Sequence, residues 1–228
     1  MVFYLKLIKN HGFRFFSKDK FTLSIYNTKM LNVLLKTFTL ICLIILTPII
    51  VISAFLILLE DGRPVFFLQK RIGKNLKIFK IYKLRTMYKT TPNLGTHEVD
   101  KSNYLKIGAI LRLTKVDELP QLVNFIKGEL FLIGPRPGLE TQLELKEQRL
   151  KRQVFNVVPG ISGLGQVLGY DMRDPLKLSK IDALYISNKN IYLDLKILIA
   201  TFFKPARKSL MIRFKDQIKN IEENSEDV

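Results

Sequence analysis

Residues 37 to 59 read TFTLICLIILTPIIVISAFLILL and carry no charged side chain. About 20 apolar residues in a helix suffice to cross the roughly 30 Å hydrocarbon core of a bilayer. Pro48 stands near the middle of the run, where it removes a backbone hydrogen bond, and the hydroxyl of Thr47 can bond to a carbonyl that is freed there. The run therefore predicts a membrane element over residues 31–60. It is either a kinked helix that spans the bilayer or a hairpin of two helices broken at Thr47-Pro48.

Basic residues flank this run on both sides. Before it stand Lys6, Lys9, Arg14, Lys18, Lys20, Lys29 and Lys36, and after it stand Arg63, Lys70, Arg71, Lys74, Lys77, Lys80, Lys83 and Arg85. Because positive segments stay on the cytoplasmic side, a spanning helix would have to export one of the two sets. A hairpin that enters and leaves by the cytoplasmic face exports neither. The residues alone leave both topologies open.

The whole chain has 228 residues, a net charge of +17 and 47% hydrophobic residues. So positive a charge predicts a negatively charged partner: nucleic acid, an anionic membrane surface or a phosphorylated substrate. The hydrophobic content and the uncharged run favour the membrane. Cys42 is the one cysteine of the sequence, so the composition excludes intrachain disulfides and cysteine-rich zinc sites.

Beyond the run, the hydrophobic periodicity predicts an α+β domain. The stretch PVFFLQKRIGKNLKIFKIYKLRTM predicts two strands around the turn GKN, and the second strand places Phe79, Ile81, Lys83 and Arg85 on one face. A polar loop follows over residues 88–101. We then expect helices at 102–113, 117–127, 138–155, 174–188 and 192–203, a short strand LFLIG, and a glycine-rich loop VVPGISGLGQVLGYD.

Two adjacent carboxylates, Asp117 and Glu118, open the segment DELPQLVNFI. On local rules Asp117 is an N-cap, with Pro120 in the tolerated first turn. A carboxylate there is kept ionised by backbone N–H groups and the helix dipole, and a bound Mg²⁺ relieves the repulsion between two neighbours. The pair is therefore either a helix cap or a site where an ionised aspartate binds Mg²⁺ or attacks phosphorus.

Two arginines near this pair are candidates for binding phosphate. Arg136 lies in GPRP, where the flanking prolines restrict the backbone, and a guanidinium on a stiff loop suits bidentate contact with phosphate. A plain surface turn gives the same pattern. Arg112 ends the preceding predicted helix, where it either caps carbonyl groups or binds phosphate. The sequence holds no GxxxxGK[ST], GxGxxG or DxD motif, which removes support for ATP-dependent and dinucleotide chemistry.

Taken together, the motifs resemble those of one family. The matching stretches are, in order, LTPII, GRPVFFLQKRIGKNLKIFKIYKLRTM, LRLTKVDELPQLVNFIKGELFLIGPRP, VVPGISGLGQV and IDALYISNKNIYLDLKILIAT. Over most of residues 38–202 the chain resembles the bacterial monotopic phosphoglycosyl transferases, also called bacterial sugar transferases or polyprenyl-phosphate hexose-1-phosphate transferases. It is similar to the small form of that family, with a basic N-terminal extension.

The resemblance implies a ping-pong reaction. Asp117 would attack the β-phosphate of a UDP-sugar, release UMP and carry a phosphosugar. Polyprenyl (undecaprenyl) phosphate would then accept the phosphosugar, giving a polyprenyl-diphosphate sugar. Glu118 would complete a catalytic dyad, and Asp117 would bind Mg²⁺. The residues implied for binding substrate and phosphate are Lys83, Arg112, Arg136 and Asp182.

The resemblance also implies the re-entrant hairpin rather than a spanning helix. The protein would then be monotopic, with its catalytic domain on the cytoplasmic face of the bacterial inner membrane. Its expected parts are a basic N-terminal extension (1–30), the hairpin (31–60), a catalytic domain of helices around a small sheet (61–215) and an acidic disordered tail (216–228). It would act in the first membrane step of a surface polysaccharide or glycoconjugate pathway.

The expected partners are a UDP-sugar, polyprenyl phosphate and the inner leaflet of the bacterial cytoplasmic membrane. The sequence leaves open which sugar is used and whether the chain forms a homodimer. The main alternative is a nonenzymatic protein that binds anionic lipid at the membrane surface, in which the two carboxylates only cap a helix. Nucleic acid is not an expected partner, because the uncharged run speaks against it.

Overall fold

The computed structural model describes residues 18–91 and 100–223. Two units follow each other along the chain, a segment that ends at Ile41 and a larger body that begins at Cys42. Parts of three predictions lie outside the described residues: the start of the N-terminal extension (1–17), the middle of the polar loop (92–99) and the end of the acidic tail (224–228).

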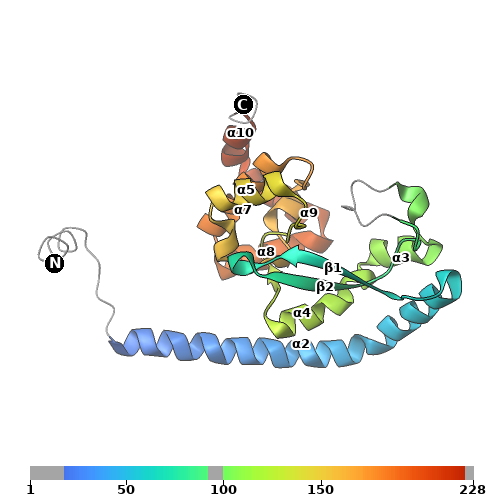
Figure 1. Cartoon of the computed structure of the whole chain (residues 1–228). Helices are drawn as coiled ribbons and strands as arrows, with labels where there is room; N and C mark the ends of the chain where they lie inside the picture. The colour runs from blue at the N-terminus through green and yellow to red at the C-terminus, as the bar shows by residue number, and fades with distance from the viewer. Residues whose placement is uncertain (1–17, 92–99, 224–228) are drawn as a thin grey trace, which may run out of the picture. The chain divides into compact units, whose positions relative to one another are not determined.

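The described chain consists mainly of helices, with two small sheets (Figure 1). Its α-helices are α2 (Lys18–Asp61), α3 (Lys106–Thr114), α4 (Leu122–Lys127), α5 (Leu143–Lys151), α6 (Leu164–Leu168), α7 (Pro175–Ser187), α8 (Ile191–Phe202), α9 (Lys204–Arg213) and α10 (Lys215–Glu223). Its strands are β1 (Phe66–Ile72), β2 (Ile78–Leu84), β3 (Phe131–Ile133) and β4 (Gly160–Ser162). Its 3₁₀ turns are η1 (Lys74–Leu76), η3 (Lys101–Asn103), η4 (Val116–Gln121) and η5 (Val154–Asn156). The predicted combination of helices with a small sheet is confirmed.

The apolar run is part of α2, which continues through Thr47 and Pro48 as one helix. The Thr47 hydroxyl donates to the Leu43 carbonyl, 2.8 Å away in the preceding turn. The structure therefore differs from the two helices of the predicted hairpin, and the hairpin stays a prediction. Among the described residues, Val33–Asp61 is the one helical stretch long and apolar enough to cross a membrane, with a mean hydropathy of 3.0 over an 18-residue window.

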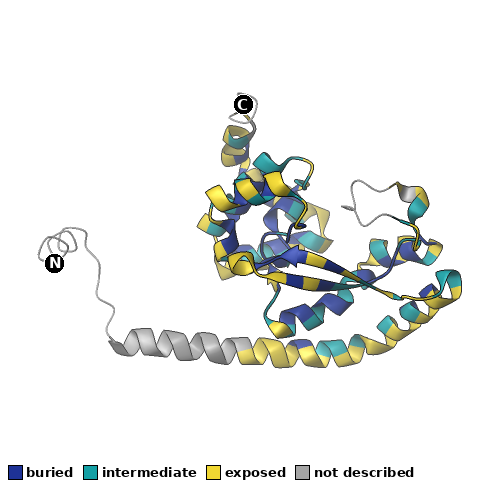
Figure 2. Ribbon diagram, viewed as in Figure 1, coloured by how far each residue is buried: buried dark blue, intermediate teal, exposed yellow. Residues whose placement is uncertain are grey.

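One face of the last turns of α2 packs against the body of the protein. Ile57 is fully buried in a cluster with Leu84 and Leu105, and Ile50 and Ala54 pack against that cluster at helical spacing. Most other side chains of the run are exposed (Figure 2), including Ile44, Ile45, Val51, Ile52, Phe55 and Leu59. So large an exposed apolar surface is typical of a helix that contacts lipid.

The end of α2 is fastened to α3 and to the end of β2. The Glu60 carboxylate accepts the backbone N–H groups of Lys106 (2.6 Å) and Ile107 (3.0 Å), which begin α3. The Asp61 carboxylate pairs with Arg85 Nη1 at 2.9 Å, just after β2. Gly62 then ends the helix in the left-handed conformation (φ 66°), which glycine adopts without strain. The two carboxylates thus join three elements at one point.

Strands β1 and β2 form the antiparallel hairpin that the sequence predicts, with Phe67 opposite Lys83 and Arg71 opposite Phe79. The predicted alternation along β2 is confirmed, because Phe79 and Ile81 are buried together with Leu130. Strand β2 packs against η4 and α4. Asn124, fully buried in α4, holds this contact: its side chain accepts the Tyr82 N–H (3.2 Å) and donates to the Lys80 carbonyl (2.7 Å).

The C-terminal helices share a second core. Ile181, Tyr185, Leu193, Ile197 and Phe214 are buried in it. The predicted disordered tail (216–228) differs from the structure over its described part, since α10 runs to Glu223. Two apolar residues three positions apart explain the difference, because Ile218 is buried in this core and Ile221 packs against it.

Candidate active site

The predicted carboxylate pair lies in η4, beside β2. Lys115 is the N-cap residue of this turn, in the left-handed conformation (φ 63°) and without a side-chain capping hydrogen bond, and Asp117 lies inside the turn. The predicted N-cap role of Asp117 is therefore wrong. Its side chain is instead buried, 6% exposed, and Asp117 Oδ1 has no hydrogen-bond partner among the described residues. A buried carboxylate oxygen without a donor is costly, and such groups are typical of functional sites.

Glu118, its neighbour, is held by two cations. Lys83 Nζ lies 2.8 Å from Glu118 Oε1, and Arg136 Nη1 lies 4.0 Å from the same oxygen. Burial favours the neutral acid, but the charges of Lys83 and Arg136 outweigh it and lower the pKa of Glu118 to about 2. Glu118 is therefore ionised at neutral pH.

Asp117 differs from Glu118 in its electrostatic environment. Burial raises the pKa of Asp117, the positive charge of Lys83 opposes that rise, and the negative charge of Glu118 adds to it. The sequence suggested that a helix N-terminus would hold this carboxylate ionised, but the 3₁₀ turn supplies Oδ1 with no N–H donor. Two adjacent carboxylates thus have pKa values displaced in opposite directions, as is common where acids have different chemical roles.

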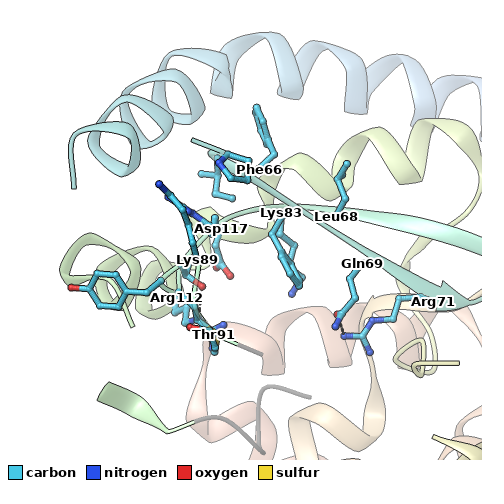
Figure 3. Close-up of a pocket in the computed structure, with 16 residues that line it drawn as sticks. Phe66, Leu68, Gln69, Arg71, Lys83, Lys89, Thr91, Arg112 and Asp117 are labelled. Carbon is cyan, nitrogen blue, oxygen red and sulfur yellow. Dashed lines mark hydrogen bonds between the residues drawn. The ribbon is translucent and has the colours of Figure 1, made fainter. Parts of the chain in front are cut away.

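Arg112 and Lys83 lie on either side of Asp117 and line the same cavity of about 460 Å³ (Figure 3). Arg112 is in the last turn of α3, and its bonds fix its direction. Arg112 Nε donates to the Thr86 hydroxyl (2.7 Å), and Nη1 donates to the Tyr104 hydroxyl (3.1 Å). The guanidinium also stacks 4.4 Å from the Tyr104 ring centre. None of these recorded bonds goes to a carbonyl of its own helix, so Arg112 is held as a cation at the cavity.

Arg136 lies in the turn GPRP, which follows β3. This turn is held against the glycine-rich loop by the parallel pairing of β3 with β4, a strand that the sequence did not predict. The backbones come so close that a Cβ on Gly160 would lie 2.1 Å from Gly134 N. Only glycine fits there. Arg136 and Lys115 then line a second cavity of about 380 Å³, together with the glycine-rich loop.

Asp182, the predicted acidic residue of the last motif, is in a buried ion pair. Arg149 Nη2 lies 2.7 Å from Asp182 Oδ2, and both side chains are almost fully buried. Arg149 Nη1 also donates to the carbonyl oxygen of Arg136 at 2.8 Å. Asp182 thus supports the turn that carries Arg136, and it also borders the second cavity. A direct contact with substrate stays a prediction.

Sequence reasoning missed Arg149 and Asn124. The signal for Arg149 is its position on α5, because Arg149 and Leu145 stand four residues apart and are both buried. An arginine on the apolar face of a helix indicates a buried ion pair. Asn124 lies in the apolar segment LVNFI, and nothing in that segment distinguishes a structural asparagine from a solvated one.

The residues at this site fit Mg²⁺ only in part. The described residues contain no cluster of three or more His, Cys, Asp or Glu side chains that could hold a metal ion. Mg²⁺, however, is commonly bound by one or two carboxylates together with substrate phosphates and water. The buried carboxylate of Asp117, which has an unpartnered oxygen, supplies one such ligand, whereas Glu118 is already paired with Lys83. The site therefore suits a metal ion that arrives with a phosphorylated substrate.

Comparison with known proteins places this site in a family. The model of the bacterial sugar transferases matches residues 27–208, which include every residue discussed above as part of the site. The chain belongs to the bacterial sugar transferase family. The resemblance inferred from the motifs is thereby confirmed, and so is the class of enzyme, a phosphoglycosyl transferase.

Three similar bacterial sugar transferases have different names. "Uncharacterized sugar transferase EpsL" of Bacillus subtilis (strain 168) is 39% identical over 156 residues, covering 68% of this chain and 77% of that protein. "UDP-N-acetylgalactosamine-undecaprenyl-phosphate N-acetylgalactosaminephosphotransferase" of Aeromonas hydrophila is 36% identical, covering 68% of this chain and 38% of that protein. "UDP-glucose:undecaprenyl-phosphate glucose-1-phosphate transferase" of Klebsiella pneumoniae is 33% identical, covering 71% and 37%. The last two names share an acceptor and differ in the sugar.

Proposed function

We propose that this protein transfers a sugar-1-phosphate from a UDP-sugar to polyprenyl phosphate and releases UMP, as the first membrane step of a surface polysaccharide or glycoconjugate pathway. One observation carries the proposal: the buried Asp117 faces a cavity lined by Lys83 and Arg112, and its Oδ1 is unpartnered. The names of two relatives support undecaprenyl phosphate as the acceptor. Because those names differ in the sugar, we assign no sugar.

In the first step, Asp117 Oδ1 attacks the β-phosphorus of the UDP-sugar. The bond from this phosphorus to the oxygen that bridges the two phosphates breaks, and UMP leaves with that oxygen. The sugar phosphate is then carried on Asp117. The cations Lys83 and Arg112 line the same cavity and would offset the negative charge that gathers on the phosphate oxygens. A carboxylate with a raised pKa is the more basic and hence the better nucleophile of the pair.

In the second step, a phosphate oxygen of the polyprenyl phosphate attacks the same phosphorus, and Asp117 leaves as a carboxylate. The product is a polyprenyl-diphosphate sugar. Glu118 stays ionised throughout, since its pKa is about 2, and it is therefore too weak a base to take a proton. We assign it the task of holding the Lys83 ammonium group beside Asp117, through the 2.8 Å ion pair.

Mg²⁺ is proposed as the cofactor, held by the Asp117 carboxylate and by phosphate oxygens of the donor. When bound, it would neutralise charge on the diphosphate. The rest of the site keeps its own roles: Arg112 is fixed by Thr86 and Tyr104, and Arg136 is fixed by the two prolines and by Arg149.

We further propose that α2 inserts into the bacterial inner membrane from the cytoplasmic side and returns as a re-entrant hairpin at Thr47-Pro48. The exposed apolar side chains of the run, the basic residues on both flanks and the membrane-bound acceptor support this placement. Reporter tags at residues 1 and 228 test it. Both tags are expected in the cytoplasm, and tags on opposite sides would establish a spanning helix.

The reaction is tested by UMP release from purified protein in lipid nanodiscs, with Mg²⁺, a panel of UDP-sugars and undecaprenyl phosphate. The half-reaction is tested without the acceptor, by exchange of labelled UMP into the UDP-sugar, which a phosphosugar-aspartate intermediate predicts. Asp117→Asn is expected to abolish both.

A matched control is Glu147→Gln, which removes an exposed carboxylate on α5 that pairs with Lys151 at the surface. This variant should retain full activity. UMP release by a folded Asp117→Asn variant would contradict the assignment of Asp117 as the nucleophile. No release from any UDP-sugar by the wild type would favour the nonenzymatic lipid-binding protein instead.

A further inference from the structure

Arg71 lies on β1 and was not among the residues predicted for the site. Gln69 and Arg71 alternate with Phe66 and Leu68, and they extend to the same side of the hairpin as Lys83 (Figure 3). The strand register agrees, since Phe67 is opposite Lys83 and the next residues on that face of β1 are Gln69 and Arg71. Arg71 is therefore on the face that carries the cations of the site.

The surroundings of Arg71 provide no counter-charge. Arg71 is 7% exposed, its Nη1 donates to the Pro137 carbonyl (3.0 Å) and its Nη2 donates to the Gln69 side chain. Both acceptors are neutral, and no ion pair joins Arg71 to a carboxylate of the described residues. Burial and, to a lesser degree, the positive charges of Arg136 and Arg149 together lower the pKa of Arg71 to about 9. A buried cation in a cationic environment is costly unless an anion joins it.

The Nε–H donor of this guanidinium is unused. Arg71 Nε is buried and has no hydrogen-bond partner among the described residues. Arg71, Lys83 and Arg136 together line a gap of about 10 Å³. That is close to the space that a single water-sized oxygen atom occupies. Arg71 also borders both larger cavities, the one at Asp117 and the one at the glycine-rich loop.

We propose that Arg71 binds a phosphate oxygen of the substrate, which enters the gap between Arg71, Lys83 and Arg136. This inference rests on the proposed function and adds a binding residue to it. The unused Nε–H supplies the hydrogen bond, and the phosphate supplies the counter-charge that the described protein groups lack. The oxygen that enters the gap belongs either to the UDP-sugar or to the polyprenyl acceptor, and the experiment separates these two sources.

Two variants are designed to weaken the contact between Arg71 and phosphate while a long polar side chain stays at each substituted position. Arg71→Lys keeps the charge and can still donate to Pro137, but it lacks the planar group and its Nε–H. Gln69→Glu leaves Arg71 and its bond to Pro137 in place and supplies an internal anion that competes with phosphate. If Arg71 only supported the turn at Pro137, Gln69→Glu would have no effect on binding. The control is Lys70→Gln, which makes the same change in charge on an exposed neighbour.

Each variant is measured in nanodiscs in two assays: the dissociation constant of UDP, which carries both phosphates of the donor, by calorimetry, and the KM for a polyprenyl phosphate. Loss of one charge-assisted hydrogen bond predicts roughly a tenfold or larger weakening in at least one assay for both variants. The UDP assay responds if a donor phosphate is bound, and the KM assay responds if the acceptor phosphate is bound. Lys70→Gln should stay within about twofold of wild type in both.

Thermal unfolding without ligand establishes first that each variant folds, and Gln69→Glu keeps the test available if Arg71→Lys does not. Folded variants that match the wild type in both assays would overturn the role of Arg71. That result differs from failure of the proposed function, in which the wild type itself releases no UMP from any UDP-sugar.

Discussion

Replacing Lys83 by methionine should destabilise the protein at neutral pH, because it leaves Glu118 buried without its nearest cation. The Lys83 and Glu118 side chains are 16% and 15% exposed and lie 2.8 Å apart. Arg136, at 4.0 Å, is then the nearest remaining cation recorded for Glu118. We expect the pKa of Glu118 to rise in the variant, since the charges that hold it at about 2 are reduced.

The size of the loss follows from that pKa. In the wild type the pKa of Glu118 falls from 4.5 to about 2 on folding. At about 1.4 kcal/mol for each pH unit, the ionised carboxylate contributes about 3 kcal/mol to the free energy of unfolding. Burial lowers the pKa of Lys83, so the ammonium group itself opposes folding, and its removal returns part of this energy. We therefore expect a net loss of about 2 kcal/mol at pH 7, or roughly 4–8 °C in Tm.

The assay is thermal unfolding in nanodiscs between pH 7 and pH 3. Because the folded pKa of Glu118 is depressed, its contribution is complete above about pH 4.5 and is lost as the pH falls toward 2. The difference in Tm between wild type and Lys83→Met should therefore shrink below about pH 4.5. Lys80→Met, an exposed position on the same strand, should change the free energy of unfolding by less than about 0.5 kcal/mol.

Two results would refute this reasoning. One is a Lys83→Met variant that unfolds at the wild-type temperature at pH 7. The other is a loss that persists unchanged at pH 3, which would assign the effect to packing of the lysine stem rather than to the ion pair.

Three further outcomes are expected. Asp117→Asn should lose UMP release. It should unfold at the same or a higher temperature than wild type, because it removes a buried charge whose Oδ1 has no hydrogen-bond partner. A fall of several degrees in its Tm would contradict this expectation. Arg149→Leu should cost about 3–5 kcal/mol, because it leaves Asp182 buried without its cation, and the double variant Arg149→Leu/Asp182→Leu should recover part of that loss in thermal unfolding. Glu60→Gln should lower the free energy of unfolding by about 1 kcal/mol, because it weakens the cap of α3. It should also slow UMP release, because α3 carries Arg112. The control Glu144→Gln, on the first turn of α5, should change neither the stability nor the rate.

Much of the site was predictable because its residues are in local patterns. Alternation along residues 78–85 placed Lys83 on the same face of β2 as Phe79 and Ile81, and the carboxylate pair and GPRP are recognisable as short motifs. The arrangement of these pieces depends on contacts between distant segments. The N-cap interpretation of Asp117 failed because Lys115 adopts a left-handed conformation and the following turn is a 3₁₀ turn. Local propensity at Asp117 does not contain that information.

Other features could not be predicted from the sequence, because they depend on contacts between residues that are far apart in the chain. Strand β4 is three residues of a glycine-rich segment and exists because β3 lies beside it, so its own composition predicts a loop. Asp182 was predicted from its motif, but that motif does not show its buried ion pair with an arginine 33 residues earlier in the chain. In α2 the local signal predicted more than the structure shows. Pro48 predicts a break, but the helix continues through Pro48, and the Thr47 hydroxyl bonds to the Leu43 carbonyl.

The junction at Glu60 and Asp61 has a mechanical consequence. The last apolar residue of the run, Leu59, is directly followed by the carboxylate that caps α3, and α3 carries Arg112 in its last turn. With α2 in a bilayer, as proposed, any tilt of its final turns would rotate α3 and swing Arg112 relative to Asp117. The reaction rate would then depend on the hydrophobic thickness of the bilayer. Activity compared across nanodiscs of lipids with shorter and longer acyl chains would measure that coupling without altering a single side chain.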